Sequence, residues 1–155
     1  MNKAKKMTLG KLIALAMEME MQAYEFYGAL EKRFCGNEQF CTCLSGVKED
    51  ELLHLRVLKE IKASLSEVRL LSPVTEESIE SMEQALEFIK HLDVGNLTST
   101  EEVCDAIGRL EAVEFDVVMN FVNADEIDFE FTREYLKNES IDHASRIYLA
   151  QQCLE

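Results

Sequence analysis

Five ionisable side chains lie at positions that a helix would bury, and all five are of metal-ligand types. They are Glu20, Glu51, His54, Glu114 and His143. Glu51 and His54 form a Glu-x-x-His motif, whose spacing directs both side chains from one helix face. A charge buried alone is costly, so it must be paired or bound to a metal. One shared metal site would account for the whole set, because carboxylates and imidazoles are common metal ligands.

Each of these residues also has a simpler interpretation. Glu51 and His54 could be a surface pair on an amphipathic helix, since Glu-x-x-His often arises by chance. His143 could be a core histidine bonded to a glutamate such as Glu20. The common register of Glu20 and Glu114 with the motif favours the metal site over these alternatives.

Four long amphipathic helices are predicted to position these residues, because apolar residues recur three and four positions apart in four segments. The predicted helices span residues 8–33, 38–65, 100–124 and 128–153. In the first helix the stripe consists of Ile13, Met17, Glu20, Tyr24 and Tyr27. In the second helix it consists of Leu44, Val47, Glu51, His54, Leu58 and Ile61. The candidate ligands continue these stripes and should therefore point into the core.

Local signals mark the predicted helix ends. Thr8 is an N-cap residue by type, and Gly36 indicates the turn after the first helix. Ser99 followed three residues later by Glu102 is a capping box. The only proline and a further helical stretch at 76–91 lie between the second and third helices. Short loops within each pair and this long crossover predict an all-α fold, an antiparallel four-helix bundle of two hairpins.

The composition agrees with one helical domain spanning 1–155. Apolar residues make up 47% of the chain, and 6 Gly with 1 Pro leave few turns. The net charge of -14 argues against a nucleic-acid partner and against an anionic membrane surface. The apolar run near the start is followed at once by Glu18 and Glu20, without a small-residue cleavage site. We therefore predict a helix rather than an export signal, and a cytoplasmic protein.

Five cysteines are present, and without an export signal we expect them to be reduced thiols. Cys35, Cys41 and Cys43 cluster at the first predicted turn. Three soft ligands could hold zinc or an iron–sulfur centre with a fourth ligand from elsewhere. Their spacing matches no established motif, so thiols at a helix end are the simpler interpretation.

The first two helices resemble those of rubrerythrin-like proteins, in the ferritin-like superfamily. The segment AMEMEMQAYEFYGAL is similar to the first helix of that family, where a ligand glutamate precedes a tyrosine by seven residues, here Glu20 and Tyr27. The segment VKEDELLHLRVLKEI is similar to the second, with Glu51 and His54 as its Glu-x-x-His.

The resemblance extends over the other two helices. RLEAVEFDVVMNFVNA is similar to the third helix and repeats the first, placing Glu114 on Glu20 and Phe121 on Tyr27. YLKNESIDHASRIYL is similar to the fourth, with His143 on His54. The resemblance therefore implies a ferritin-like bundle with a di-iron carboxylate site.

The fourth segment departs from the family pattern. Ser140 stands where the family has a metal-bridging glutamate, and a neutral hydroxyl is a poor ligand for a hard cation. Glu139 lies about 100° away around the helix and could swing in. Glu111 lies one turn before Glu114 and could reach the same cavity, although Glu111 and Glu139 could equally be solvated. The chain also lacks a Cys-x-x-Cys pair of the rubredoxin kind.

Two functions follow from the resemblance. In the first, the chain binds iron as a di-iron or single-iron centre, or another divalent metal, and reacts with peroxide or dioxygen. Glu20, Glu51 and His54 would hold one metal, and Glu114 and His143 the other, with Glu111 or Glu139 in place of Ser140. The electron donor is not identified, and a homodimer is expected. In the second, the protein is a degenerate ferritin-like module with one metal or none that acts through partners.

Overall fold

The computed structural model describes residues 7–123. The fourth predicted helix, 128–153, lies outside these residues, together with Glu139, Ser140 and His143. Phe121 lies within a helix, and the structure describes its backbone but not its side chain.

The described part of the chain is all-helical. Its helices are α1 (Leu9–Arg33), α2 (Glu38–Ser64), α3 (Glu67–Leu70), α4 (Glu76–Lys90), the 3-10 helix η1 (Val94–Asn96) and α5 (Thr100–Asn123). The predicted helices at 8–33, 38–65 and 100–124, and the crossover helix at 76–91, are each confirmed to within one residue at either end. Residues 7–123 form no strand, only an isolated bridge between Thr8 and Pro73.

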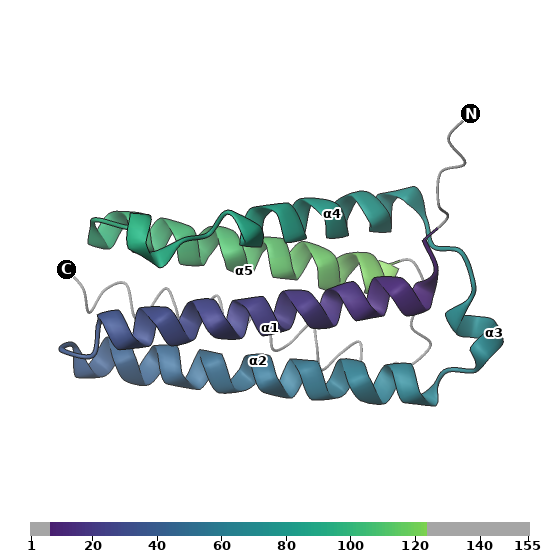
Figure 1. The fold of residues 1–155 in the computed structure, drawn as a ribbon, viewed down its shortest axis with the longest axis horizontal. Coiled ribbons are helices and arrows are strands. Elements are labelled where there is room, and N and C mark those ends of the chain that lie inside the picture. Colours follow the sequence, from purple (N-terminus) through teal and green to yellow (C-terminus); the bar gives the residue numbers. More distant parts are fainter. Residues whose placement is uncertain (1–6, 124–155) are drawn as a thin grey trace.

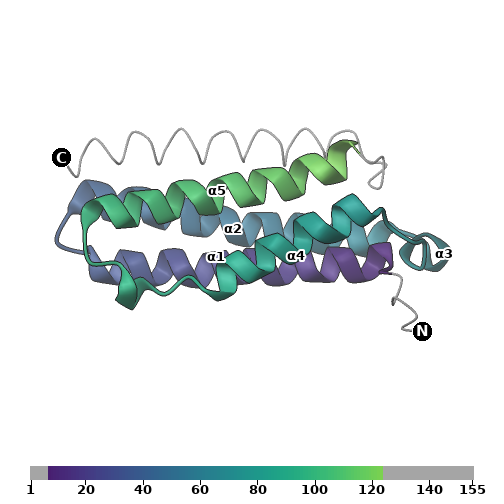
Figure 2. The same cartoon turned by 90° about the horizontal axis from the view of Figure 1, so that it is seen from above.

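Helices α1 and α2 form an antiparallel hairpin, and α4 and α5 cover one side of it (Figure 1). Helix α2 ends at the end of the bundle where α1 begins, and α4 runs back along the bundle to the opposite end. Helix α5 therefore starts beside the α1–α2 turn and runs parallel to α2, as the view from above also shows (Figure 2). This crossover brings residues of α5 next to the middle of the hairpin.

The helix ends are built as the sequence predicts. The Thr8 side chain accepts a hydrogen bond from the Lys11 amide at 3.3 Å, which caps α1. At the start of α5 the Ser99 hydroxyl accepts from the Glu102 amide at 3.1 Å. The Glu102 carboxylate accepts in return from the Ser99 amide at 3.4 Å, so the capping box is complete.

Hydrogen bonds attach the crossover to both ends of α1. At the start of the helix the Leu9 amide donates to the Ser72 carbonyl at 2.9 Å. At its other end the Arg33 guanidinium donates to the Val94 carbonyl at 2.5 Å. The crossover therefore holds α4 and α5 in a defined position along the hairpin.

The buried face of α1 differs from the predicted stripe. Met17 and Tyr24 are only partly buried, whereas Ala16, Met19 and Ala23 are fully buried. Helix α1 contacts both α2 and α4, so it buries a wider face than one stripe, centred on different residues. In α2 all six predicted stripe residues are buried. No helix within residues 7–123 has the length and apolar composition that crossing a membrane requires.

Candidate metal centre

Three helices bring five ionisable side chains to the interior of the bundle. Glu20 lies on α1, Glu51 and His54 on α2, and Glu111 and Glu114 on α5. None of the five is more than 4% exposed. They lie at the middle of the helices, where neighbouring turns bury apolar side chains on the same faces.

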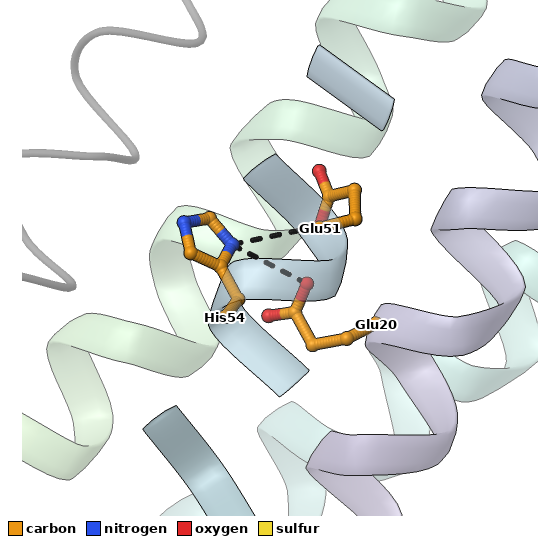
Figure 3. Close-up of side chains that lie close together, drawn as sticks. All are labelled: Glu20, Glu51 and His54. Atoms are coloured by element: carbon orange, nitrogen blue, oxygen red, sulfur yellow. Dashed lines mark ion pairs between the residues drawn. The ribbon is translucent and has the colours of Figure 1, made fainter. Parts of the chain in front are cut away.

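The first donor group combines two carboxylates with the imidazole. The Nδ1 atom of His54 lies 3.5 Å from a carboxylate oxygen of Glu20 and 3.5 Å from one of Glu51. Figure 3 shows both carboxylates directed toward this ring nitrogen, Glu20 reaching across from α1. Donor atoms of all three residues lie within 4.8 Å of one another, close enough to bind one ion.

The second donor group consists of carboxylates alone. Oxygens of Glu51, Glu111 and Glu114 also lie within 4.8 Å of one another. Glu51 belongs to both groups, so the two possible ion positions are adjacent. A carboxylate with two oxygens can serve both positions at once, as bridging carboxylates do in di-metal bundles.

The Tyr27 hydroxyl orients the second group. It donates a hydrogen bond to Glu111, and the tyrosine ring is fully buried. Burial raises the pKa of Tyr27 well above its usual value, and the charges of Glu111, Glu114 and Glu51 raise it further. Tyr27 therefore keeps its proton and holds one carboxylate oxygen of Glu111 in place.

Two carboxylates of the cluster, Glu51 and Glu114, resist ionisation in the absence of a cation. Burial raises the pKa of Glu51 well above its usual value, and the charges of Glu114 and Glu20 raise it further. Burial likewise raises the pKa of Glu114, with added repulsion from Glu111 and Glu20. Within residues 7–123 no lysine or arginine is buried. The negative charge can therefore be neutralised by protons, including one on His54, or by a bound cation, but not by a described lysine or arginine.

The donor set suits a divalent metal of intermediate hardness. Carboxylate oxygens with an imidazole nitrogen are common ligands of iron, manganese and zinc. The oxygen Oε1 of Glu114 is buried and has no hydrogen-bond partner among the described residues, as an oxygen directed at an ion would be. Four carboxylates offset the repulsion between two adjacent dications. The described residues therefore fit a metal ion, or a pair of them.

Most of the residues predicted from the sequence as ligands lie together. The structure brings together Glu20, Glu51, His54 and Glu114, and Glu111 lies with them. The alternative that Glu111 is solvated is wrong, because it is buried. Glu139, Ser140 and His143 are outside the described residues. The contact between Tyr27 and Glu111 was not predicted; the signal available was Tyr27 on the same stripe as Glu20.

The cysteines at the α1–α2 turn do not form a three-ligand metal site in the described part of the chain. The only groups of three metal-binding side chains found within residues 7–123 are the two that share Glu51. The zinc or iron–sulfur alternative for Cys35, Cys41 and Cys43 therefore has no support from the geometry.

The fold and the site together define a helical bundle with an acidic interior cluster that includes one histidine. Comparisons with protein-family models, with curated proteins and with solved structures found no match to this chain. A proposal for its function therefore rests on the residues of the site.

Proposed function

We propose that this chain is an iron-binding protein of the rubrerythrin-like class, with two adjacent metal positions inside a ferritin-like bundle. The observation that supports the proposal most directly is the sharing of Glu51 by two buried three-donor groups. Surface acids would not produce this arrangement, because uncompensated carboxylates are expelled from an apolar interior unless a cation or a proton accompanies them.

Each residue has a distinct role in the proposal. Glu20 and His54 would hold a metal at the first position, Glu111 and Glu114 would hold one at the second, and Glu51 would serve both. Bound ferrous iron would supply electrons for the reduction of peroxide or dioxygen. The protein's own contribution is to orient the carboxylates, through Tyr27 among others, and to exclude bulk water.

The wider proposal follows the resemblance of the sequence to the family. The predicted fourth helix, 128–153, would complete the bundle and contribute His143. A small oxidant would be the substrate, a separate protein or small molecule would donate electrons, and two copies of the chain would associate.

Iron content tests the proposal. The chain is loaded with excess ferrous ion under anaerobic conditions and desalted, and iron per chain is measured. We expect at least one tightly held iron in the unsubstituted protein and almost none after Glu51→Gln, because that change removes a donor from both groups. Glu49→Gln is the matched control, since Glu49 lies on the same helix and is exposed. Equal iron in the Glu51→Gln protein would refute the proposal.

A second candidate is a non-catalytic descendant that binds one metal or none, and Ser140 favours it. Without a bridging carboxylate from the fourth segment, the position served by Glu20, Glu51 and His54 should be better occupied than the other. Ser140→Glu should then raise iron per chain toward two and increase any peroxidase activity. If the unsubstituted chain already holds two irons tightly and the substitution changes nothing, the second candidate and the assigned role of Ser140 are both wrong.

A further inference from the structure

Two Phe-Cys dipeptides lie side by side at the turn between α1 and α2. Phe34 and Cys35 follow the last residue of α1, and Phe40 and Cys41 lie in the first turns of α2. The rings of Phe34 and Phe40 pack edge to face, with their centroids 5.4 Å apart. Each cysteine directly follows one of these rings, so both belong to the same turn.

The backbone of the turn keeps this arrangement compact. The Asn37 amide donates to the Phe34 carbonyl at 2.9 Å, which folds the chain back after α1. The Asn37 side chain then accepts from the Phe40 amide at 3.0 Å and caps α2. Only five residues separate the two cysteines, and they are confined by a helix end on each side.

Both cysteines line one surface hollow of about 460 Å³. Its other lining residues are Glu31, Lys32, Thr42 and Ser45. Cys35 is exposed to solvent, whereas Cys41 is partly buried. The Cys41 thiol donates a hydrogen bond to the Glu31 carbonyl at 3.2 Å. The hollow thus presents one accessible thiol and one sheltered thiol to the same small volume.

We propose that Cys35 and Cys41 are a reversible redox pair, which a hydroperoxide oxidises to a disulfide across the helix turn. The Cys35 thiolate attacks the hydroperoxide, so a sulfur–oxygen bond forms, the oxygen–oxygen bond breaks and an alcohol or water leaves. The Cys41 sulfur then displaces water from the Cys35 sulfenic acid, and the disulfide forms. Two thiols lose two electrons and two protons, and the hydroperoxide gains them. A small thiol such as glutathione reverses the change by exchange.

The surroundings assign different roles to the two thiols. Burial raises the pKa of Cys41, and the nearby Cys35 and Glu31 raise it further, so Cys41 remains a thiol at neutral pH. Cys35 is exposed to solvent, so a hydroperoxide can reach its sulfur. Cys35 is therefore the attacking residue and Cys41 the resolving residue. The reaction involves no metal and does not rest on the iron site.

Cys43 provides the matched control. It lies two residues after Cys41, which places it about 200° around the helix. It packs against the hydrophobic core and does not line the hollow. Replacing Cys43 should thus leave the pair intact, although it removes a cysteine from the same turn.

Thiol counting and peptide mapping test the proposal on the 155-residue chain. The protein is treated with a small excess of hydrogen peroxide, the remaining thiols are alkylated and counted, and the peptides are analysed by mass spectrometry. Two of the five thiols should disappear and return after dithiothreitol. Cleavage after Glu38 separates Cys35 from Cys41, so their disulfide should appear as two linked peptides.

Variants locate the bond. Cys43→Ser should lose two thiols as the unsubstituted chain does, whereas Cys35→Ser and Cys41→Ser should form no internal disulfide. In Cys41→Ser the Cys35 sulfenic acid should be trapped by dimedone. Protein treated with a metal chelator should lose the same two thiols, which separates this test from that of the iron site.

Three outcomes would overturn the proposal. They are no loss of thiols with peroxide, a disulfide that includes Cys43, and a pair that includes neither Cys35 nor Cys41. Cys41 and Cys43 lie on the same peptide after cleavage at glutamates, so fragment ions from breaks between them identify the linked cysteine. The unsubstituted chain alone then distinguishes these outcomes, and the proposal is tested even if a variant does not fold.

Discussion

Two glutamates of helix α5 show opposite behaviour within one helix. Glu102 is exposed and accepts hydrogen bonds from the amide and hydroxyl of Thr98, which lower its pKa. Glu114 lies about three turns further on, and burial raises its pKa well above the usual value, with repulsion from Glu111 and Glu20. The same side chain is thus an anion at the helix end and resists ionisation at the helix middle.

The difference follows from what the helix offers at each place. Just before the first turn the amides of Thr98 and Ser99 have no partner inside the helix, so they can bind a carboxylate. In the middle of the helix the amides are already bonded to carbonyls one turn earlier, and the neighbours of Glu114 are other carboxylates. A carboxylate cluster at this depth therefore has to take up protons or a cation.

Metal removal should cause the largest loss of stability, and the loss should depend on the buried cluster and not on Glu102. If the free metal concentration is about 1,000 times the Kd for the folded protein, binding adds about 4 kcal/mol to the free energy of unfolding. For a chain of this size, that corresponds to a midpoint about 10 °C lower after chelation. Thermal unfolding followed by circular dichroism measures the change in midpoint. Glu102→Gln should keep the full change, and Glu51→Gln should show none.

The second-largest effect should be the change in the free energy of unfolding of the metal-free protein with pH. The folded pKa values of Glu51 and Glu114 lie above the unfolded value of 4.5, so the folded state keeps protons that the unfolded state releases. Stability is then greatest below about that value and is lost as pH rises toward the folded pKa values, by about 1.4 kcal/mol per pH unit for each carboxyl group. Urea unfolding between pH 5 and 8 tests this. Glu114→Gln should flatten the dependence; an unchanged slope would contradict the assignment.

Tyr27→Phe should have an intermediate effect. It removes the donor to Glu111 and leaves a buried carboxylate oxygen without that bond, at a cost of about 1–3 kcal/mol. Tyr24→Phe is the control, because Tyr24 is on the same helix and only partly buried. Urea unfolding at constant pH gives both values. Equal losses in the two variants would show that the Tyr27 hydroxyl does not stabilise the cluster.

The smallest expected effect is that of Glu102→Gln, and its pH dependence should have the opposite sign. The pKa of Glu102 is lowered by the bonds from Thr98 and Ser99, so its contribution is present above the unfolded pKa. That contribution is lost as pH falls through the folded pKa. The substitution should therefore cost little at neutral pH, and the cost should shrink as the pH falls below the unfolded pKa. Glu101→Gln, the exposed neighbour, should be neutral over the same pH range, and an effect as large as that of Glu102→Gln would contradict the role assigned to Glu102.

The helices could be predicted from the sequence because their signals are local. Thr8 and the Ser99–Glu102 pair each act within three residues, and the apolar period extends over several turns. Helix α3 was not predicted, since its four residues are too few to show a period. The positions of Met17 and Tyr24 were wrong because the packing of α4 on α1 is a tertiary contact that no local pattern contains.

In the candidate site, too, local signals could be predicted from the sequence and tertiary contacts could not. Glu20, Glu51, His54 and Glu114 follow from the stripes of their own helices, so their burial could be predicted. The burial of Glu111 depends on how α5 is rotated against α1. Its partner Tyr27 is 84 residues away, and a single sequence carries no signal for a pair so distant.

The crossover from α2 to α5 has a consequence for chain entropy. The first donor group is contained between Glu20 and His54 on the hairpin, whereas the second needs Glu51 and α5 to meet across the crossover. The entropic cost of closing a loop grows only with the logarithm of its length, by about 0.6 kcal/mol for each doubling. The exposed part of the crossover around Val68 and Leu71 is therefore a place where residues could be inserted with little loss of stability, as long as Ser72 and Val94 keep their bonds to α1.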